Sequence, residues 1–287
     1  PPVAVCEPGG CGGRAVTNPT TLGQRRSLWF QVLMGILGVC VLVFVLGPII
    51  SMVAATSTEE LTSAATDREV LDSIKITLLA ALAATVVSAV GGIPLAYLLA
   101  RKRFFGRGLI MAIVDLPIVI PHSAAGVALL TVIGRRSLLG QAAGGSLMDS
   151  VAGISVAMAF VSIPFLVNAA REAFLAVPIR LEQAARVLGA SPCRVFFTIS
   201  LPMAWRGVAS GLILMGARGI SEFGAVVVIA YHPMTTPVMV FQRLQDFGLA
   251  YARSVAVVLV LVCVSVFIVL RVLARRPAGE AERAGTV

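Results

Sequence analysis

The sequence has 287 residues, of which 58% are hydrophobic and only 13% are charged. A soluble domain carries about twice that charged fraction, so the composition excludes a soluble globular protein and favours a membrane protein with several spans. The net charge of +9 comes from basic residues that flank the apolar stretches. Basic residues in such places set membrane orientation, so the charge does not indicate binding to nucleic acid.

Six apolar stretches are long enough to cross a bilayer, which takes about 20 residues. We place them near residues 28–54, 76–100, 108–134, 151–176, 206–230 and 254–275. The predicted fold is an all-α polytopic membrane protein with one six-helix transmembrane domain over residues 28–276. Residues 1–27 are rich in Pro, Gly and Thr and lack periodicity, which predicts a disordered tail. Residues 277–287 are predicted to form a second, short tail.

The loops alternate between basic-rich and basic-poor segments. Four basic residues lie within 101–107 and five within 171–206, whereas the loop at 56–75 carries five acidic residues. By the positive-inside rule, the basic-rich loops and both tails lie in the cytoplasm. The chain is therefore predicted to be a multi-pass protein of the plasma or inner membrane, with both termini cytoplasmic.

The loop at 178–203 is the one long segment between spans that is neither apolar nor irregular. Four apolar residues recur at i, i+3, i+4 and i+7, which predicts an amphipathic helix over 180–188. They are Leu181, Ala184, Ala185 and Leu188. Gly189 is suited to end this helix, and a second helix is predicted from Pro192 to about Ser200. We call the whole segment 178–203 the bracket.

The bracket resembles the cytoplasmic loop of ABC importer permeases, whose pattern is E-A-A, three residues, G, nine residues, I, one residue, L-P. Six residues are in register with it: Ala184, Ala185, Gly189, Ile199, Leu201 and Pro202. The first position is Gln183 here, and Glu182 precedes it. In that family the loop docks into a separate ATPase subunit and transmits its closure. The resemblance implies a type I ABC importer permease fold, with the bracket as its cytoplasmic coupling helices.

The sequence lacks the motifs of an enzyme. It has no phosphate-binding G-x-x-x-x-G-K-[ST] loop and no H-E-x-x-H or G-x-S-x-G motif. Its five cysteines form no cluster typical of a metal site. We therefore expect no catalytic residue, metal or cofactor in this chain, and we expect ATP and Mg²⁺ to be bound by a partner ATPase.

Few ionisable residues lie within the apolar stretches: Asp115, His122, Arg218 and Glu222. Each is costly in hydrocarbon, so each is expected to face a cavity or a partner. Arg218 and Glu222 are four residues apart and can pair on one helix face, and Asp115 can reach Arg218 from a neighbouring helix. Two interpretations stay open. The group either joins helices as polar contacts or, with Ser221 and Phe223, lines a translocation path or its gate.

Two stretches resemble a narrower family. Residues 217–230 are similar to the fifth-span signature of permeases for tetrahedral oxyanions, A-R-x-x-x-E-F-G-A, and residues 115–122 are similar to the third span of the molybdate/tungstate branch. The resemblance covers most of residues 70–271. It implies the permease subunit of an ABC importer for molybdate or tungstate. The implied partners are a second copy of the chain, an ABC ATPase subunit and an extracytoplasmic oxyanion-binding protein.

Two alternatives remain at this stage. The cargo could instead be sulfate or thiosulfate, because sulfate permeases share the core of the signature. The chain could also be an ion-coupled secondary transporter or channel that uses its intramembrane charges as a relay. The bracket argues against the second alternative, because a secondary transporter has no need of it.

Overall fold

The computed structural model of the chain describes residues 20–142 and 147–273. Every regular element among these residues is a helix. Five helices are long and apolar enough to cross a membrane, and the count rises to six if α4 and α5 form one bent span. The prediction of an all-α fold with six spans is confirmed. The chain divides into two compact units, Pro1–Ala55 and Thr56–Val287, which are described separately.

The first unit contains a single described element, α1 (Thr20–Ala54), a helix of 35 residues. The prediction placed residues 20–27 in an irregular tail, and the structure shows them as helix. Propagating an existing helix needs only one new hydrogen bond per residue, and no proline follows Pro19 until Pro48, so the apolar helix extends backwards into polar sequence. The rest of the predicted tails, residues 1–19 and 277–287, lies outside the described residues, as do residues 274–276 at the end of the predicted transmembrane domain.

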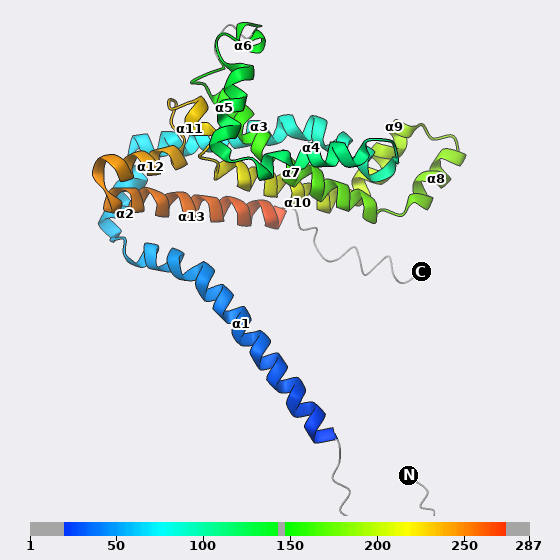
Figure 1. The fold of residues 1–287 in the computed structure, drawn as a ribbon, viewed down its shortest axis with the longest axis horizontal. Helices are drawn as coiled ribbons and strands as arrows, with labels where there is room; N and C mark the ends of the chain where they lie inside the picture. Colours follow the sequence, from blue (N-terminus) through cyan, green and yellow to red (C-terminus); the bar gives the residue numbers. More distant parts are fainter. Residues whose placement is uncertain (1–19, 143–146, 274–287) are drawn as a thin grey trace, which may run out of the picture. The chain divides into compact units, whose positions relative to one another are not determined.

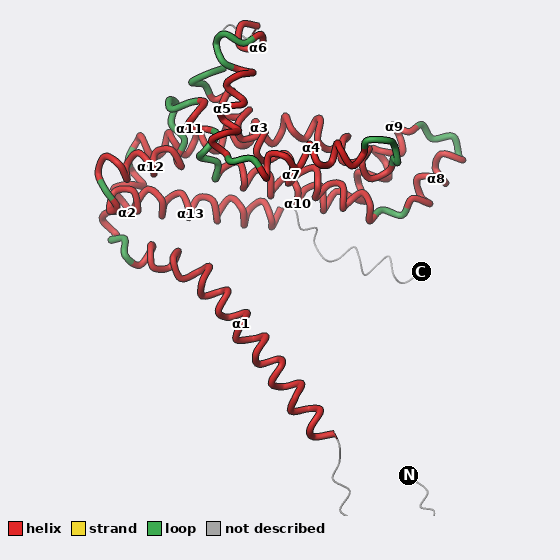
Figure 2. Tube along the Cα trace, viewed as in Figure 1, coloured by secondary structure: helices red, strands yellow, loops and turns green. Residues whose placement is uncertain are grey.

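The second unit is built around four long helices that run side by side (Figure 1). They are α3 (Arg68–Arg101), α7 (Val151–Ala176), α10 (Leu201–Ile220) and α13 (Leu249–Leu273). Shorter helices complete it: α2 (Thr58–Thr66), α4 (Arg107–Val119), α5 (His122–Ile133), α6 (Leu138–Ala142), α8 (Ile179–Val187), α9 (Pro192–Val195), η1 (Phe196–Ser200), α11 (Val226–Ile229) and α12 (Thr236–Phe247). Helices α8 and α9 lie at one end of the long helices and α2 and α12 at the other, with short connecting loops (Figure 2).

Small side chains line most of the buried face of α3 between Thr77 and Ala96, and larger side chains of α7 pack against them. One buried cluster includes Ala80, Ala81 and Ala84 of α3 together with Ala157 of α7. A second cluster, nearer the bracket, is centred on Phe174 and includes further alanines of α3, α7 and α10. Small residues let helices approach closely, and such packing holds membrane helices together because lipid offers no hydrophobic driving force between them.

The third predicted span, residues 108–134, is not one straight helix. Helices α4 and α5 meet at a bend of 114°. The cause is Pro121, which lacks a backbone donor and disfavours helical geometry at the residue before it. Ile120 is accordingly extended, with φ −73° and ψ 134°. The prediction gave residues 108–134 as one apolar span, and the structure divides it into two helices at Ile120 and Pro121.

The fifth predicted span, residues 206–230, is also interrupted. Helix α10 begins earlier, at Leu201, and ends at Ile220, and the chain turns before the short helix α11. The segment 231–253, predicted as a loop, contains α12. Three buried hydroxyl groups join α12 to α3, because the Thr236 amide donates to Thr77 Oγ1 (2.9 Å) and Ser73 Oγ donates to Thr236 Oγ1 (3.2 Å).

Candidate functional site

The bracket has the predicted form of two helices, α8 and α9, joined by a tight turn at Gly189, which we call the corner. Gly189 has φ +87°, the left-handed conformation that glycine adopts without strain. Its amide donates to the Arg186 carbonyl (3.0 Å), and the Ala190 amide donates to the Ala185 carbonyl (3.0 Å). This pair of bonds is a Schellman cap, which satisfies carbonyls left free at the end of α8. Ser191 then caps α9 by accepting a hydrogen bond from the Arg194 amide.

The second helix of the bracket does not end at Ser200. Helix α9 passes into the π-helical turn η1, in which the Leu201 amide reaches back to the Phe196 carbonyl, and η1 passes directly into α10. Pro202 is the second residue of α10, so this continuous stretch of helix lacks one backbone donor where η1 becomes α10. The bracket is therefore continuous with a transmembrane helix.

Most of the bracket residues that match the permease pattern lie at the surface. Gln183, Ala184 and Pro202 are exposed and Ala185, Ile199 and Leu201 are half-buried. Large apolar side chains beside them are open as well: Val187 and Leu188 are each 87% exposed, and Leu181 is 44% exposed. The apolar face of the predicted amphipathic helix is thus not covered by the described part of this chain.

Glu182 differs from its neighbours because it is only 2% exposed. Its Oε1 accepts hydrogen bonds from Arg101 Nε (2.8 Å) and Ser200 Oγ (2.8 Å), and its Oε2 accepts one from Tyr97 Oη (3.2 Å). Although Glu182 belongs to the bracket, its carboxylate points into the chain. Gln183, which occupies the family's glutamate position, is the exposed member of the pair.

A second group of predicted residues gathers where α5 begins and α10 ends. Arg218 Nη1 lies 3.0 Å from Glu222 Oε2, and Arg218 Nη2 lies 2.8 Å from His122 Nε2. His122 Nδ1 lies 3.4 Å from Glu222 Oε2. Arginine has only donors, so Nε2 accepts from it, and a neutral imidazole then carries its proton on Nδ1, towards Glu222. With a neutral His122, the three residues carry no net charge.

The pairing of Arg218 with Glu222 is as predicted, but its geometry is not. Glu222 follows the end of α10, so the two residues do not share a helix face. The buried carboxylate instead closes a local turn by accepting from the Ala225 amide (2.9 Å). Gly224 lets this turn approach α5, because a Cβ at this position would lie 2.7 Å from His122 Cβ.

The remaining path candidates are placed around this group. Ser221 is exposed and lies 3.5 Å from Arg218 Nη1. Phe223 stacks near Phe241 of α12, with ring centroids 5.1 Å apart. Asp115 does not join the group, because its Oδ1 accepts a hydrogen bond from Asn168 of α7 (2.7 Å). The predicted Asp115–Arg218 contact is therefore replaced by a contact with an uncharged side chain.

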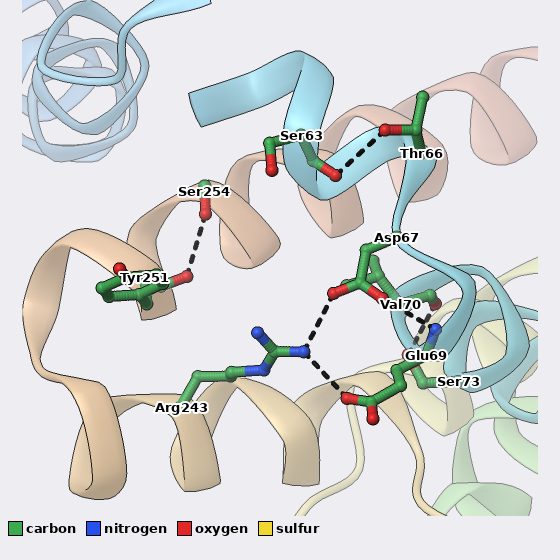
Figure 3. A network of polar contacts seen from close by, with 9 residues as sticks. All are labelled: Ser63, Thr66, Asp67, Glu69, Val70, Ser73, Arg243, Tyr251 and Ser254. Atoms are coloured by element: carbon green, nitrogen blue, oxygen red, sulfur yellow. Dashed lines mark hydrogen bonds and ion pairs between the residues drawn. The ribbon is translucent and has the colours of Figure 1, made fainter. Parts of the chain in front are cut away.

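The end of the second unit opposite the bracket holds ion pairs that the sequence alone did not reveal (Figure 3). Arg243 of α12 lies 3.0 Å from both Asp67 Oδ2 and Glu69 Oε2, at the start of α3. Arg253 of α13 lies 3.3 Å from Glu60 Oε2 of α2. The Ser57 amide and, to a lesser extent, Arg253 hold the pKa of Glu60 below its ordinary value. These pairs fasten the short helices α2 and α12 to the long ones.

Several known proteins are similar to this chain in sequence. The family model described as "Binding-protein-dependent transport system inner membrane component" matches residues 92–279. The chain is 45% identical over 205 residues to the molybdate/tungstate transport system permease protein WtpB of Pyrococcus abyssi, which covers 71% of this chain and 79% of that protein. It is 42% identical over 242 residues to the protein of the same name in Thermococcus kodakarensis, with 84% and 94% covered.

A solved structure agrees on the fold. A bacterial ABC transporter involved in the import of the acidic polysaccharide alginate is similar with a TM-score of 0.67, at 17% identity, over 89% of this chain and 97% of that one. The resemblance that the bracket motif indicated is thus confirmed. The chain belongs to the family of binding-protein-dependent transport system inner membrane components and is a multi-pass ABC importer permease subunit with the type I fold.

Proposed function

We propose that this permease carries a tetrahedral oxyanion, molybdate or tungstate, into the cell at the expense of ATP hydrolysed by a partner subunit. The observation that carries the proposal is the bracket, whose apolar face is exposed while the rest of it is continuous with α10. Such a face is typical of a site that binds another protein or a membrane surface, and the match of the bracket to the coupling loop of ABC permeases favours a protein partner. The names of the relatives, which are 42–45% identical, support the choice of cargo.

The charges of the fold support a cytoplasmic bracket. The end of α3, the start of α4, the end of α7 and the start of α10 all lie near α8 and α9 (Figure 1). These segments bring Arg101, Lys102, Arg103, Arg107, Arg171 and Arg206 to one end. The acidic residues of α2 and of the start of α3 lie at the other end. The positive-inside rule then puts the bracket, both termini and the ATP-binding partner on the cytoplasmic side.

In the proposed cycle, two copies of the chain form one path and each bracket docks on one ATPase subunit. ATP binding draws the ATPase subunits together, the brackets follow, and the path opens outward to an anion-loaded binding protein. Hydrolysis returns it to the inward-open state. ATP and Mg²⁺ belong to the ATPase, and this chain makes or breaks no covalent bond.

The Arg218 group fits a path that must not hold its cargo tightly. The Arg218 side chain is 24% exposed, so an anion can approach it, but Glu222 already neutralises its charge. Conduction requires binding that is favourable enough for entry and weak enough for release. We assign Arg218, with His122 and Ser221 beside it, to a weak anion contact or gate, and we leave high-affinity capture to the binding protein.

Cys193 provides a test of the orientation. It is exposed in the bracket, so in a variant whose other four cysteines are replaced we expect a membrane-impermeant maleimide to label it in inside-out vesicles and not in intact cells. Glu59→Cys, on exposed α2, in a variant whose five native cysteines are all replaced should show the opposite pattern. Labelling of Cys193 from outside intact cells would overturn the proposed topology.

Reconstitution tests the function itself. The permease is placed in liposomes with its candidate ATPase and binding protein, and ATP hydrolysis is measured with the binding protein loaded with molybdate, tungstate or sulfate. We expect stimulation by molybdate or tungstate, and the most effective anion identifies the cargo. Stimulation by sulfate alone would transfer the proposal to the sulfate alternative. Failure to bind any ATPase, combined with uptake driven by an ion gradient, would favour a secondary transporter.

A further inference from the structure

A buried carboxylate on the bracket makes a direct link to the transmembrane helices. The backbone of α8 packs mainly against α9 and η1, its neighbours within the bracket. Glu182 is the residue through which α8 also reaches α3, since it accepts hydrogen bonds from Arg101 and Tyr97, both of which lie in the last two turns of that helix.

The same contact also includes α7. Arg101 Nη2 lies 2.8 Å from Glu182 Oε1 and donates to the carbonyl of Val177, the residue that ends α7 (2.9 Å). The Tyr97 ring packs edge-on against Phe174 of α7, with centroids 5.3 Å apart, and against Phe196 of η1, with centroids 4.9 Å apart. One carboxylate thus joins the bracket to the ends of two membrane helices.

The π-helical turn directs a third donor residue to the same carboxylate. A π turn contains one residue more than an α turn, and such insertions shift the side chains that follow and are frequent at functional sites. Here the turn directs the buried Ser200 hydroxyl at Glu182 Oε1 (2.8 Å), at the point where η1 becomes α10. Glu182 therefore contacts α3 through Arg101 and Tyr97 and the turn before α10 through Ser200, while α7 is joined to it through Arg101.

The charge of this pair is not required for packing. Apolar groups of similar volume fill buried sites at no loss of stability, whereas a buried ion pair gains little unless its geometry is held. The surroundings of Glu182 hold that geometry, because every donor comes from a different turn or element. A charged contact of this kind resists displacement of one element against another.

We infer that Glu182 and Arg101 form a joint that transmits movement of the coupling helix α8 to α3 and α7, so that both are positioning residues for transport. The inference rests on the proposed function, in which α8 docks on an ATPase. It predicts that loss of the joint separates ATP hydrolysis from movement of the anion. Docking itself would continue, because the exposed apolar face of α8 is unchanged.

Glu182→Gln tests the joint, because it keeps the shape and removes the charge. In liposomes with ATPase and loaded binding protein, we expect a smaller yield of complex, because the buried Arg101 loses its anion, and continued ATP hydrolysis by the complex that assembles. The anion taken up per ATP hydrolysed should fall about tenfold, since the charged pair no longer resists displacement. The matched control is Glu172→Gln, which removes a 67% exposed carboxylate paired with Arg171 (2.6 Å) at the same end of the fold. It should leave that ratio unchanged.

A second variant covers the case in which Glu182→Gln does not assemble because Arg101 is left buried and unpaired. Glu182→Gln combined with Arg101→Gln removes both charges, so assembly should return while uptake per ATP stays low. Normal uptake per ATP in either variant overturns the joint, as does failure of both to assemble, which would assign the pair to folding alone. Absence of ATPase binding or anion-stimulated hydrolysis in the unmodified protein would instead contradict the proposed function.

Discussion

Replacing Gly189 by proline is expected to abolish binding of the ATPase subunit while the transmembrane helices still fold. Gly189 has φ +87°, whereas proline is fixed near −65°, and proline also lacks the N–H that Gly189 donates to the Arg186 carbonyl. A proline in an incompatible position costs about 3 kcal/mol or more, which reduces the population of the native corner on the order of a hundredfold. Copurification of a tagged permease with its ATPase measures the effect.

Gly189→Asn is the control for this prediction. A Cβ at this position meets nothing within 4 Å, and asparagine enters the left-handed region more readily than other residues with side chains. We expect the asparagine variant to recover most of the ATPase. Normal copurification with the proline variant would show that the corner is not required for docking.

Arg218→Ala is expected to reduce anion uptake far more than assembly with the ATPase. The substitution removes the guanidinium that an anion would meet and leaves Glu222, 1% exposed, without its cation. Leaving one member of a buried pair uncompensated costs about 3–5 kcal/mol, so some loss of folded protein is also expected. Uptake of labelled molybdate or tungstate, normalised to the amount of assembled complex, separates the two effects.

A double variant distinguishes the two roles of Arg218 that the sequence left open. Arg218→Ala with Glu222→Gln removes both charges, so stability should recover. Uptake should remain low if Arg218 serves the path, whereas its recovery would show that the pair only joins helices. Asp115→Asn is the matched control, because Asp115 contacts Asn168 and lies outside the group.

Local patterns in the sequence predict much of this fold. Hydropathy places the C-terminal ends of α1, α3, α7 and α13 to within about two residues, although α1 and α3 begin well before the predicted spans. The i, i+3, i+4 pattern with Gly189 and Ser191 predicts the first bracket helix and the turn that follows it. The capping box of Ser57 and Glu60 was a readable start signal for α2 within a segment taken as a loop. These features depend on residues within one or two turns of each other.

The features that escaped prediction depend on tertiary contacts or on competing local rules. A proline does not always break a span, since Pro94 lies inside the continuous helix α3. The sequence around Pro121 therefore did not show that the chain bends there so that α5 packs on α11. Arg218 and Glu222 are four residues apart and can form an ion pair whether the helix continues through both residues or ends between them. Their spacing therefore did not reveal that α10 ends at Ile220. Nothing near Glu182 in the sequence indicates that its carboxylate is buried or that it pairs with Arg101, 81 residues away.

The alanine-rich face of α3 has a consequence for the rate of conformational change. Alanine has no side-chain rotamers, so on the α3 side of the contact no side chain has to leave one energy well for another when the helices shift. Ala80, Ala81 and Ala84 of α3 lie in one cluster with the larger Met158 and Val161 of α7. Shear between packed helices is one of the standard modes of switching. We therefore expect the barrier to a shift of α7 along α3 to arise from the α7 side chains and from the charged contacts at the helix ends, and not from α3.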